Sequence, residues 1–484
     1  MKVPGLRSFE NYRNKEKLLR KGEEIVLKIE DVAYGGLGVA RIDGVVVFVE
    51  KGLPGQTVRA RVMKKKSDYL TARVLDVLKP ADYEVPPKCA HFGVCGGCKW
   101  QNVDYSQQLQ FKQKIVRDSL QRIGGFYAVS VQPTLSSPDV FFYRNKMEFS
   151  FSDKRWLLSN QEQDEKPKDF ALGLHVPRRY DKIVDIDTCY LQSPESNRLL
   201  NLVKKFTRES GEKPWSTASH TGFWRHLVIR EGKHTGQRMV NVVTSEKNEA
   251  LMNRLKEKIL ESGIPVSSFV NNINRSKGST AFGEEEWTVW GDRIIEEKLG
   301  SYRFKISANS FFQTNTKQAE RLYDTVIDLS GFTGNEIVYD LYSGTGTISI
   351  YISKRVQRVL GVEAMEAAIQ DARRNKALNQ TENVEFVLGD VKDEMKRIEE
   401  LMNVVGHPDV FIIDPPRAGL HPKSLQSILK LAPEKIVYVS CNPTTLARDL
   451  SEWKDRYILR YVQPVDMFPH TYHIETVALL ERKS

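Results

Sequence analysis

The C-terminal part of the chain constrains the fold most, because apolar, β-rich runs alternate there with helical stretches. Five such runs recur at regular intervals: Ile337–Leu341, Val359–Val362, Val384–Leu388, Val410–Ile413 and Ile436–Val439. Between them lie stretches with helical spacing, for example Met365, Ile369 and Ala372 along one face. This alternation predicts a parallel α/β sheet covered by helices on both faces. We expect this domain to occupy residues 306–484.

The preceding sequence predicts two further domains. From Glu23 onward, short alternating apolar runs are separated by glycines, which predicts a small closed β-barrel over residues 17–80. The lysine run at 64–66 is expected in a loop of this barrel. A helix is predicted from about Tyr105 to Arg122, and residues 81–305 are expected to form a central α+β domain. Its charged insertion, residues 161–169, is expected to be a surface loop.

The composition indicates a basic globular protein. The chain carries 72 Lys and Arg against 62 Asp and Glu, a net charge of +10, which suits a polyanionic partner but does not by itself identify one. Five cysteines, an odd and sparse number in 484 residues, argue against a disulfide framework. No apolar run reaches membrane-helix length and the N-terminus lacks a secretion signal, so we expect a cytoplasmic protein without a membrane partner.

A glycine-containing loop follows the first strand of the C-terminal domain, in Asp340-Leu-Tyr-Ser-Gly-Thr-Gly-Thr347. Glycines at this edge of a sheet let the backbone approach a ligand closely. A dinucleotide fingerprint would need a third glycine where Ser349 stands, and the lysine of a phosphate-binding loop is also absent. Acids lie at the ends of four strands, Asp340, Glu363, Asp390 and Asp414. Together they predict a crevice for a nucleoside.

Cys441 is the candidate nucleophile because it follows the strand Ile436–Val439 at the same sheet edge. One reaction that needs such a thiolate is methylation of a uracil ring, because addition of sulfur to carbon 6 makes carbon 5 nucleophilic toward a methyl sulfonium. A base must then remove the proton from carbon 5. Glu475, just before the terminal strand, is the candidate base, with His470 and His473 as rivals.

Four cysteines outside this site form a second candidate centre: Cys89, Cys95, Cys98 and Cys189. Four thiolates can hold zinc or an iron–sulfur cluster. Spacing slightly favours zinc, because structural zinc is common, although the irregular first gap is unlike paired zinc knuckles. Unliganded cysteines remain an alternative.

Five motifs occur in the order found in RNA uridine-5-methyltransferases: Phe311-Phe-Gln-Thr-Asn315, the 340–347 loop, Asp414-Pro-Pro-Arg417, Ser440-Cys-Asn-Pro443 and the 469–475 segment. The chain resembles this family over nearly its whole length, in particular its bacterial 23S ribosomal RNA branch. The resemblance implies a Rossmann-like class I methyltransferase domain and an N-terminal OB-like TRAM barrel that binds RNA. It also implies a central iron–sulfur domain.

The resemblance also implies roles for individual residues. The four cysteines would bind a 4Fe–4S cluster, which replaces the preference for zinc. Cys441 would be the nucleophile and Glu475 the proton acceptor, and Tyr143–Lys146 would lie near the RNA. The S-adenosylmethionine contacts would be Gln313, Tyr342, Thr347, Glu363, Asp390 and Asp414. Ser343 stands where many members have cysteine, and Thr347 where some have asparagine.

The expected activity is methylation of uridine at carbon 5, with 23S ribosomal RNA as substrate and a monomeric enzyme. Transfer RNA is an alternative substrate. A purine N-methyltransferase is a second alternative, since Asp-Pro-Pro also occurs in such enzymes. A third is a non-catalytic, redox-responsive RNA-binding protein.

Overall fold

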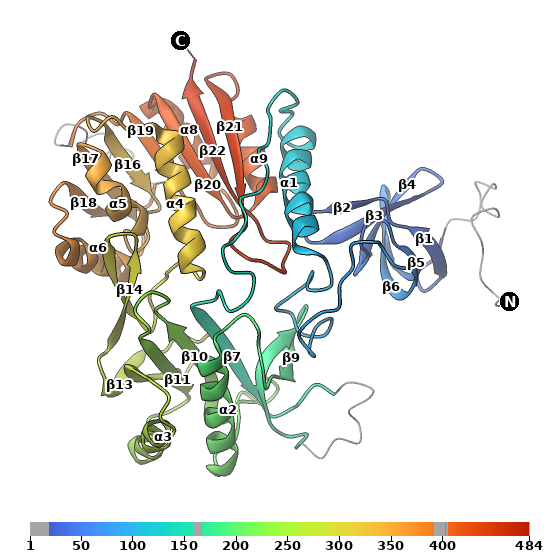
Figure 1. Cartoon of the computed structure of the whole chain (residues 1–484), viewed down its shortest axis with the longest axis vertical. Coiled ribbons are helices and arrows are strands. Elements are labelled where there is room, and N and C mark those ends of the chain that lie inside the picture. The colour runs from blue at the N-terminus through green and yellow to red at the C-terminus, as the bar shows by residue number, and fades with distance from the viewer. Residues whose placement is uncertain (1–18, 158–166, 392–401, 403–404, 484) are drawn as a thin grey trace.

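The computed structural model describes residues 19–157, 167–391, 402 and 405–483, which form three large sheets and one hairpin (Figure 1). The first two residues of the expected barrel, and residues 161–166 of the charged insertion, lie outside this range. None of the helices in the described part combines the length and the apolar character that crossing a bilayer requires.

The N-terminal sheet has six strands in the order β1-β5-β6-β4-β3-β2. Side chains alternate along its strands: Ile25 and Leu27 are fully buried, whereas their neighbours are partly exposed. The lysine run is not wholly in a loop as expected, because Lys64 and Lys65 end a strand and only Lys66 follows it. The strands are β1 (Glu24–Lys28), β2 (Asp31–Ala33), β3 (Leu37–Ile42), β4 (Val45–Glu50), β5 (Thr57–Lys65) and β6 (Tyr69–Lys79).

The central sheet has seven strands in the order β13-β12-β11-β10-β7-β8-β9, and helices α2 and α3 pack on one of its faces. A separate hairpin, β14-β15, leads to the C-terminal domain. The elements are β7 (Lys146–Ser152), β8 (Ala171–Val176), β9 (Arg179–Asp185), α2 (Pro194–Glu209), β10 (Trp224–Glu231), β11 (Arg238–Thr244), α3 (Glu249–Glu261), β12 (Ser268–Ile273), β13 (Glu285–Gly291), β14 (Ile294–Leu299) and β15 (Tyr302–Ser307).

The C-terminal sheet has the order β18-β17-β16-β19-β20-β22-β21, with the first five strands parallel. The predicted parallel α/β fold is therefore confirmed, and two antiparallel strands extend it. Its strands are β16 (Ile337–Leu341), β17 (Arg358–Glu363), β18 (Val384–Leu388), β19 (Val410–Ile413), β20 (Lys435–Ser440), β21 (Tyr457–Val465) and β22 (Glu475–Arg482).

A hydrophobic core covers each face of this sheet, and neighbouring residues of one strand point into different cores. Val338 belongs to the core formed with α4, α5 and α6, and Tyr339 belongs to the core formed with α1, α8 and α9. The predicted helix α1 is confirmed, and the side chain of Asp104 caps its first turn. The helices are α1 (Tyr105–Arg122), α4 (Thr316–Ser330), α5 (Thr347–Ile352), the 3₁₀ helix η2 (Ser353–Arg355), α6 (Glu366–Asn379), α8 (Pro422–Leu431) and α9 (Pro443–Ser451).

Candidate active site

The loop after β16 has an unusual backbone. Tyr342, Gly344 and Gly346 have φ angles of 69°, 55° and 79°, in the left-handed region. A left-handed tyrosine is strained, and strain of this kind concentrates at functional sites. A Cβ atom at Gly346 would lie 2.5 Å from the Phe386 ring, so only glycine fits there. This geometry starts α5 at Thr347 and leaves the loop at the carboxyl edge of the sheet, where ligands bind in such folds.

Asp340 has a structural position rather than one in the crevice. It is fully buried, and its Oδ2 accepts hydrogen bonds from the backbone N–H and the hydroxyl of Ser349, at 3.1 and 2.5 Å. Burial raises its pKa to about 7. Asp340 therefore connects α5 to the sheet. The other three expected acids, Glu363, Asp390 and Asp414, are partly exposed at the strand ends.

The carboxylate of Glu363 is fixed by two backbone groups. Its Oε2 accepts from the N–H of Gly344 at 3.0 Å and its Oε1 from the N–H of Met365 at 2.8 Å. This acid therefore lies against the glycine loop with its orientation set. Two large apolar side chains that are exposed, Met365 and Leu388, follow or end the neighbouring strands β17 and β18. The sequence predicts Met365 on one helical face with Ile369 and Ala372, but Met365 precedes α6 and is exposed. Together with Leu388 it offers an apolar surface for a planar ring.

The 311–315 segment lies beside the same loop. The carbonyl of Phe311, whose side chain is 66% exposed, accepts a hydrogen bond from the Thr345 hydroxyl at 3.2 Å. Asn145, in the predicted Tyr143–Lys146 segment, donates to the carbonyl of Gln313 at 2.8 Å and to the Thr316 hydroxyl at 2.9 Å. This positioning by Asn145 was not visible in the sequence, because the two segments meet only in the folded chain.

Two further predicted cofactor contacts are oriented by neighbouring helices. The Tyr342 hydroxyl donates to the Ser424 hydroxyl over 3.4 Å, and the hydroxyls of Thr347 and Tyr323 are 3.0 Å apart. The structure thus brings the six predicted contact residues to one edge of the sheet.

Cys441 directly follows β20 and is partly exposed. In the antiparallel pair β20-β22, Ser440 lies opposite Thr476, so the next residue on each side, Cys441 and Glu475, face each other. Burial raises the pKa of the Cys441 thiol to about 12, and the negative charges of Glu475 and Asp414 act in the same direction. The Arg417 guanidinium opposes this rise. The structure therefore brings both predicted catalytic residues together.

The two carboxyl groups beside Cys441 are also perturbed. Burial raises the pKa of Glu475 well above its ordinary value, and the nearby Asp414 raises it further. Burial, with a smaller effect of Asp340, raises the pKa of Asp414 to about 7. Carboxylates with raised pKa values are stronger proton acceptors.

The two histidines have packing contacts instead. The N–H of His470 donates to Gln108 at 2.8 Å, its ring stacks on Phe141 at 4.3 Å, and burial lowers its pKa to about 4. His473 lies against Tyr472, and burial lowers its pKa to about 4 as well. Glu475 acts on Cys441 directly, and this favours Glu475 as the base.

The four predicted metal ligands line one cavity: Cys89, Cys95, Cys98 and Cys189. Amide groups approach two of their sulfurs, with the Gly97 N–H 3.3 Å from Cys95 Sγ and Gln101 Nε2 3.5 Å from Cys98 Sγ. Within the described residues, no group of three or more His, Cys, Asp or Glu side chains is arranged to hold a metal ion.

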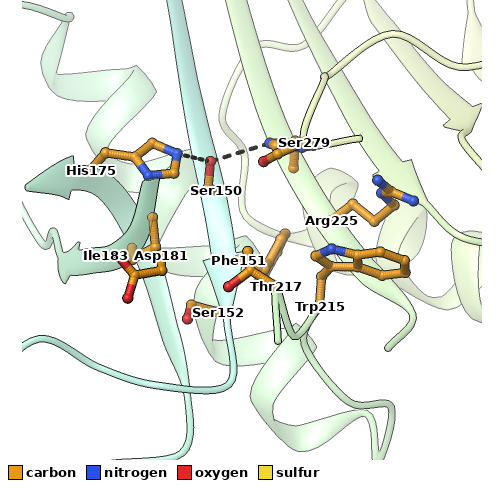
Figure 2. Close-up of a pocket in the computed structure, with 11 residues that line it drawn as sticks. Ser150, Phe151, Ser152, His175, Asp181, Ile183, Trp215, Thr217, Arg225 and Ser279 are labelled. Atoms are coloured by element: carbon orange, nitrogen blue, oxygen red, sulfur yellow. Dashed lines mark hydrogen bonds between the residues drawn. The ribbon is translucent and has the colours of Figure 1, made fainter. Parts of the chain in front are cut away.

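A smaller polar cavity lies in the central sheet (Figure 2). Ser150 bridges His175 and His226 there, at 3.1 and 3.3 Å. The Arg225 guanidinium carbon lies 3.8 Å from the centroid of the Trp215 ring, and Figure 2 shows these two side chains side by side. Its volume of about 10 Å³ is room for no more than a water molecule. These groups therefore have a structural role.

Known proteins match nearly the whole chain. A TRAM domain matches residues 19–75, and the family described as tRNA (Uracil-5-)-methyltransferase matches residues 244–483. An uncharacterized RNA methyltransferase of Chlorobaculum tepidum is 46% identical, over 96% of this chain and 97% of that protein. Another, from Bacteroides thetaiotaomicron, is 40% identical over 93% of this chain and 100% of that protein.

Among solved structures, the tRNA (uracil-54, C5)-methyltransferase of Pyrococcus abyssi, in complex with S-adenosyl-L-homocysteine, is 33% identical. It superposes with a TM-score of 0.72 and covers 94% of this chain and 99% of that chain. Identity and coverage at these levels, together with the motif order and the site geometry, show that the chain belongs to the RNA (uracil-5-)-methyltransferase family and is an enzyme of that class.

Proposed function

We propose that the chain transfers a methyl group from S-adenosylmethionine to carbon 5 of a uridine in 23S ribosomal RNA. The methyl transfer to uridine is supported by the placement of Cys441 opposite Glu475, at the sheet edge that also holds the glycine loop. Ribosomal RNA as the substrate rests on the resemblance of the sequence motifs. A thiol and a carboxyl group in this arrangement suit addition to a pyrimidine ring followed by proton removal.

The crevice suits S-adenosylmethionine. Glu363, held by two backbone N–H groups, would accept hydrogen bonds from the ribose hydroxyls, and the exposed Met365 and Leu388 would pack against adenine. Gln313, Tyr342, Thr347, Asp390 and Asp414 complete the proposed contacts. When bound, the cofactor supplies an electrophilic methyl group on a positively charged sulfur.

The residues act in sequence on a uridine turned out of its RNA fold, because carbons 5 and 6 must both be reached. The Cys441 thiolate forms a bond to carbon 6, and the electron pair of the 5,6 double bond makes carbon 5 nucleophilic. Once carbon 5 carries the methyl group, the Glu475 carboxylate accepts the proton that is still bound to carbon 5. The sulfur–carbon bond then breaks, which restores the double bond and frees the thiolate.

We also propose a 4Fe–4S cluster on Cys89, Cys95, Cys98 and Cys189. The four thiols surround one cavity, and thiolates bound to different irons of a cluster lie farther apart than the ligands of one ion. The cavity lies beside the catalytic segment, since the N–H groups of Lys99 and Trp100 donate to the His470 carbonyl at 2.8 and 3.0 Å. This placement supports the proposal that the cluster has a structural role.

Transfer RNA is the second candidate substrate, favoured by the similarity to the Pyrococcus abyssi enzyme. Mapping 5-methyluridine in ribosomal and transfer RNA from a deletion strain distinguishes the two. We expect a site to be lost from 23S ribosomal RNA and restored by the wild-type gene. Loss from transfer RNA alone would support the second candidate, and an unchanged map in both RNAs would contradict the proposed function.

A further inference from the structure

A tyrosine of the N-terminal sheet reaches the catalytic site. Tyr34 follows β2 and is half-buried. Arg417 Nη2 donates to the hydroxyl of Tyr34 at 3.2 Å and is 3.4 Å from the hydroxyl of Tyr472. The two tyrosine rings meet edge to face, with centroids 5.8 Å apart and an interplanar angle of 88°. One guanidinium is therefore held by hydroxyls from two domains.

The turn that carries Tyr34 is built for this contact. Gly36 has a φ of 68°, and a Cβ atom there would lie 3.3 Å from Tyr472 Cβ, tighter than most such contacts. The chain reverses within this turn through a hydrogen bond from the Gly36 N–H to the Ala33 carbonyl at 3.1 Å. A glycine at this position therefore allows the turn to pack against the catalytic 469–475 segment.

Arg417 is also joined to the nucleophile loop. Its carbonyl accepts a hydrogen bond from the side chain of Asn442, the residue after Cys441, at 3.1 Å. The negative charges of Glu475 and Asp414 raise the pKa of Cys441, and the positive charge of Arg417 lowers it. The Arg417 guanidinium thus favours a negative charge on the sulfur, and the hydrogen bond with Asn442 joins Arg417 to the nucleophile loop.

On the basis of the proposed function, we propose that Tyr34 is a positioning residue for the reaction: its hydroxyl holds the Arg417 guanidinium where this cation stabilises the Cys441 thiolate. A cation beside a cysteine favours its thiolate form, and a cation free to move does so less. The N-terminal sheet therefore completes the catalytic site in addition to any contact that it makes with RNA.

The test uses the Tyr34→Phe variant of the full chain, which loses the hydroxyl and keeps the ring against Tyr472. With RNA carrying 5-fluorouridine and with S-adenosylmethionine present, we expect the covalent adduct to form about tenfold more slowly, the scale of one hydrogen bond to a charged group. The dissociation constant for RNA should not change. Labelling of Cys441 by iodoacetamide, measured by peptide mass spectrometry from pH 6 to 10, should be slower in Tyr34→Phe than in wild type at each pH.

Tyr83→Phe is the matched control. The Tyr83 hydroxyl donates to the Pro54 carbonyl, and its ring packs on Phe111 of α1, so this change also removes a hydroxyl beside the N-terminal sheet. It does not touch Arg417, and we expect wild-type adduct and labelling rates.

A double-variant cycle separates positioning from general damage. In an Arg417→Gln background, Tyr34→Phe should cause no further loss, because the cation that it holds is gone. Equal losses in both backgrounds, a wild-type rate in Tyr34→Phe, or a loss explained by weaker RNA binding would each overturn the inference. If wild-type enzyme formed no adduct at all, the proposed function itself would fail.

Discussion

Cys441 lies where a nucleophile is expected, but its thiol is in the protonated, less reactive form. Burial and two neighbouring carboxyl groups raise its pKa to about 12, so the thiol is protonated at neutral pH in the free protein. The thiolate is the nucleophilic form. The site must therefore stabilise the thiolate when substrate and cofactor are bound. The Arg417 guanidinium is one positive charge that does so, and the sulfonium of the proposed cofactor would be another.

The first prediction concerns the pH dependence of Cys441 labelling. Below its pKa, the thiolate fraction of a thiol rises about tenfold per pH unit, so labelling by iodoacetamide should rise about 100-fold from pH 7 to pH 9 without a plateau. Peptide mass spectrometry of the free enzyme measures this rate. A plateau below pH 8 would show that the thiol ionises more easily than its surroundings indicate.

The second prediction concerns Glu475. In Glu475→Gln the thiol can still add to the ring and carbon 5 can still be methylated, but its proton has no acceptor. We expect the covalent protein–RNA complex to accumulate with unmodified RNA, and turnover to fall by about 10²- to 10⁴-fold. Denaturing gels and intact mass measure the complex.

Glu481→Gln is the control for this variant, because Glu481 lies on the same strand and forms an exposed ion pair with Arg460. Its turnover should match wild type. Normal turnover in Glu475→Gln would mean that another group accepts the proton from carbon 5.

At the level of elements, the sequence predicted the parallel strands well, because continuous apolar runs are typical of strands buried on both faces. Three of the five predicted runs coincide with β16, β18 and β19, and two differ by one residue at each end. Strand β21 was missed. Its pattern is interrupted by Arg460 and Pro464, and it pairs at the edge of the sheet through a shifted register.

The site was predictable where a motif sits at a strand end, as for Cys441 and Glu363. It was not predictable where two distant segments meet, as for Asn145 beside Gln313 or Tyr34 beside Arg417. Asp340 shows a further limit. The sequence places an acid at the end of a strand, but only the contacts with Ser349 show that it faces the protein interior.

The third prediction belongs to the glycine loop. Gly346→Ala places a Cβ against the Phe386 ring in a backbone conformation that alanine disfavours, so the loop must shift. We expect affinity for S-adenosylhomocysteine, measured by calorimetry, to fall about tenfold or more.

Gly334→Ala is the matched control, since Gly334 also has a positive φ, of 103°, but has open space around its Cβ position. Its affinity should equal that of wild type. Equal losses in both variants would mean that backbone strain in general, and not the loop's fit to Phe386, weakens binding.

At the level of the whole molecule, the segment before β22 joins distant parts of the chain. Lys112 of α1 is fully buried and contacts Asp466 at 2.5 Å and the Phe468 carbonyl at 3.0 Å. The Tyr105 hydroxyl donates to the other oxygen of Asp466 at 2.9 Å. A basic residue in an amphipathic helix gives no sign in the sequence that it will be buried, because its partner lies far along the chain.

The fourth prediction follows from this ion pair. Lys112→Met leaves the Asp466 carboxylate buried without its cation, and the loss of one partner of a buried pair costs about 3–5 kcal/mol. Chemical denaturation should show this loss in the free energy of unfolding. Lys258→Met, which removes an exposed pair with Glu261, should change that free energy by less than about 1 kcal/mol. A similar small change in both variants would contradict the assigned role of the pair.

The central claim is that sulfur attacks the pyrimidine ring before the methyl group is transferred. It is tested most directly by intact mass spectrometry of the purified enzyme incubated with S-adenosylmethionine and RNA carrying 5-fluorouridine at the mapped site. Fluorine cannot leave carbon 5 as a proton does, so we predict a stable protein–RNA adduct in wild type and none in Cys441→Ala. Adduct formation or methylation of unmodified RNA by Cys441→Ala would contradict the account.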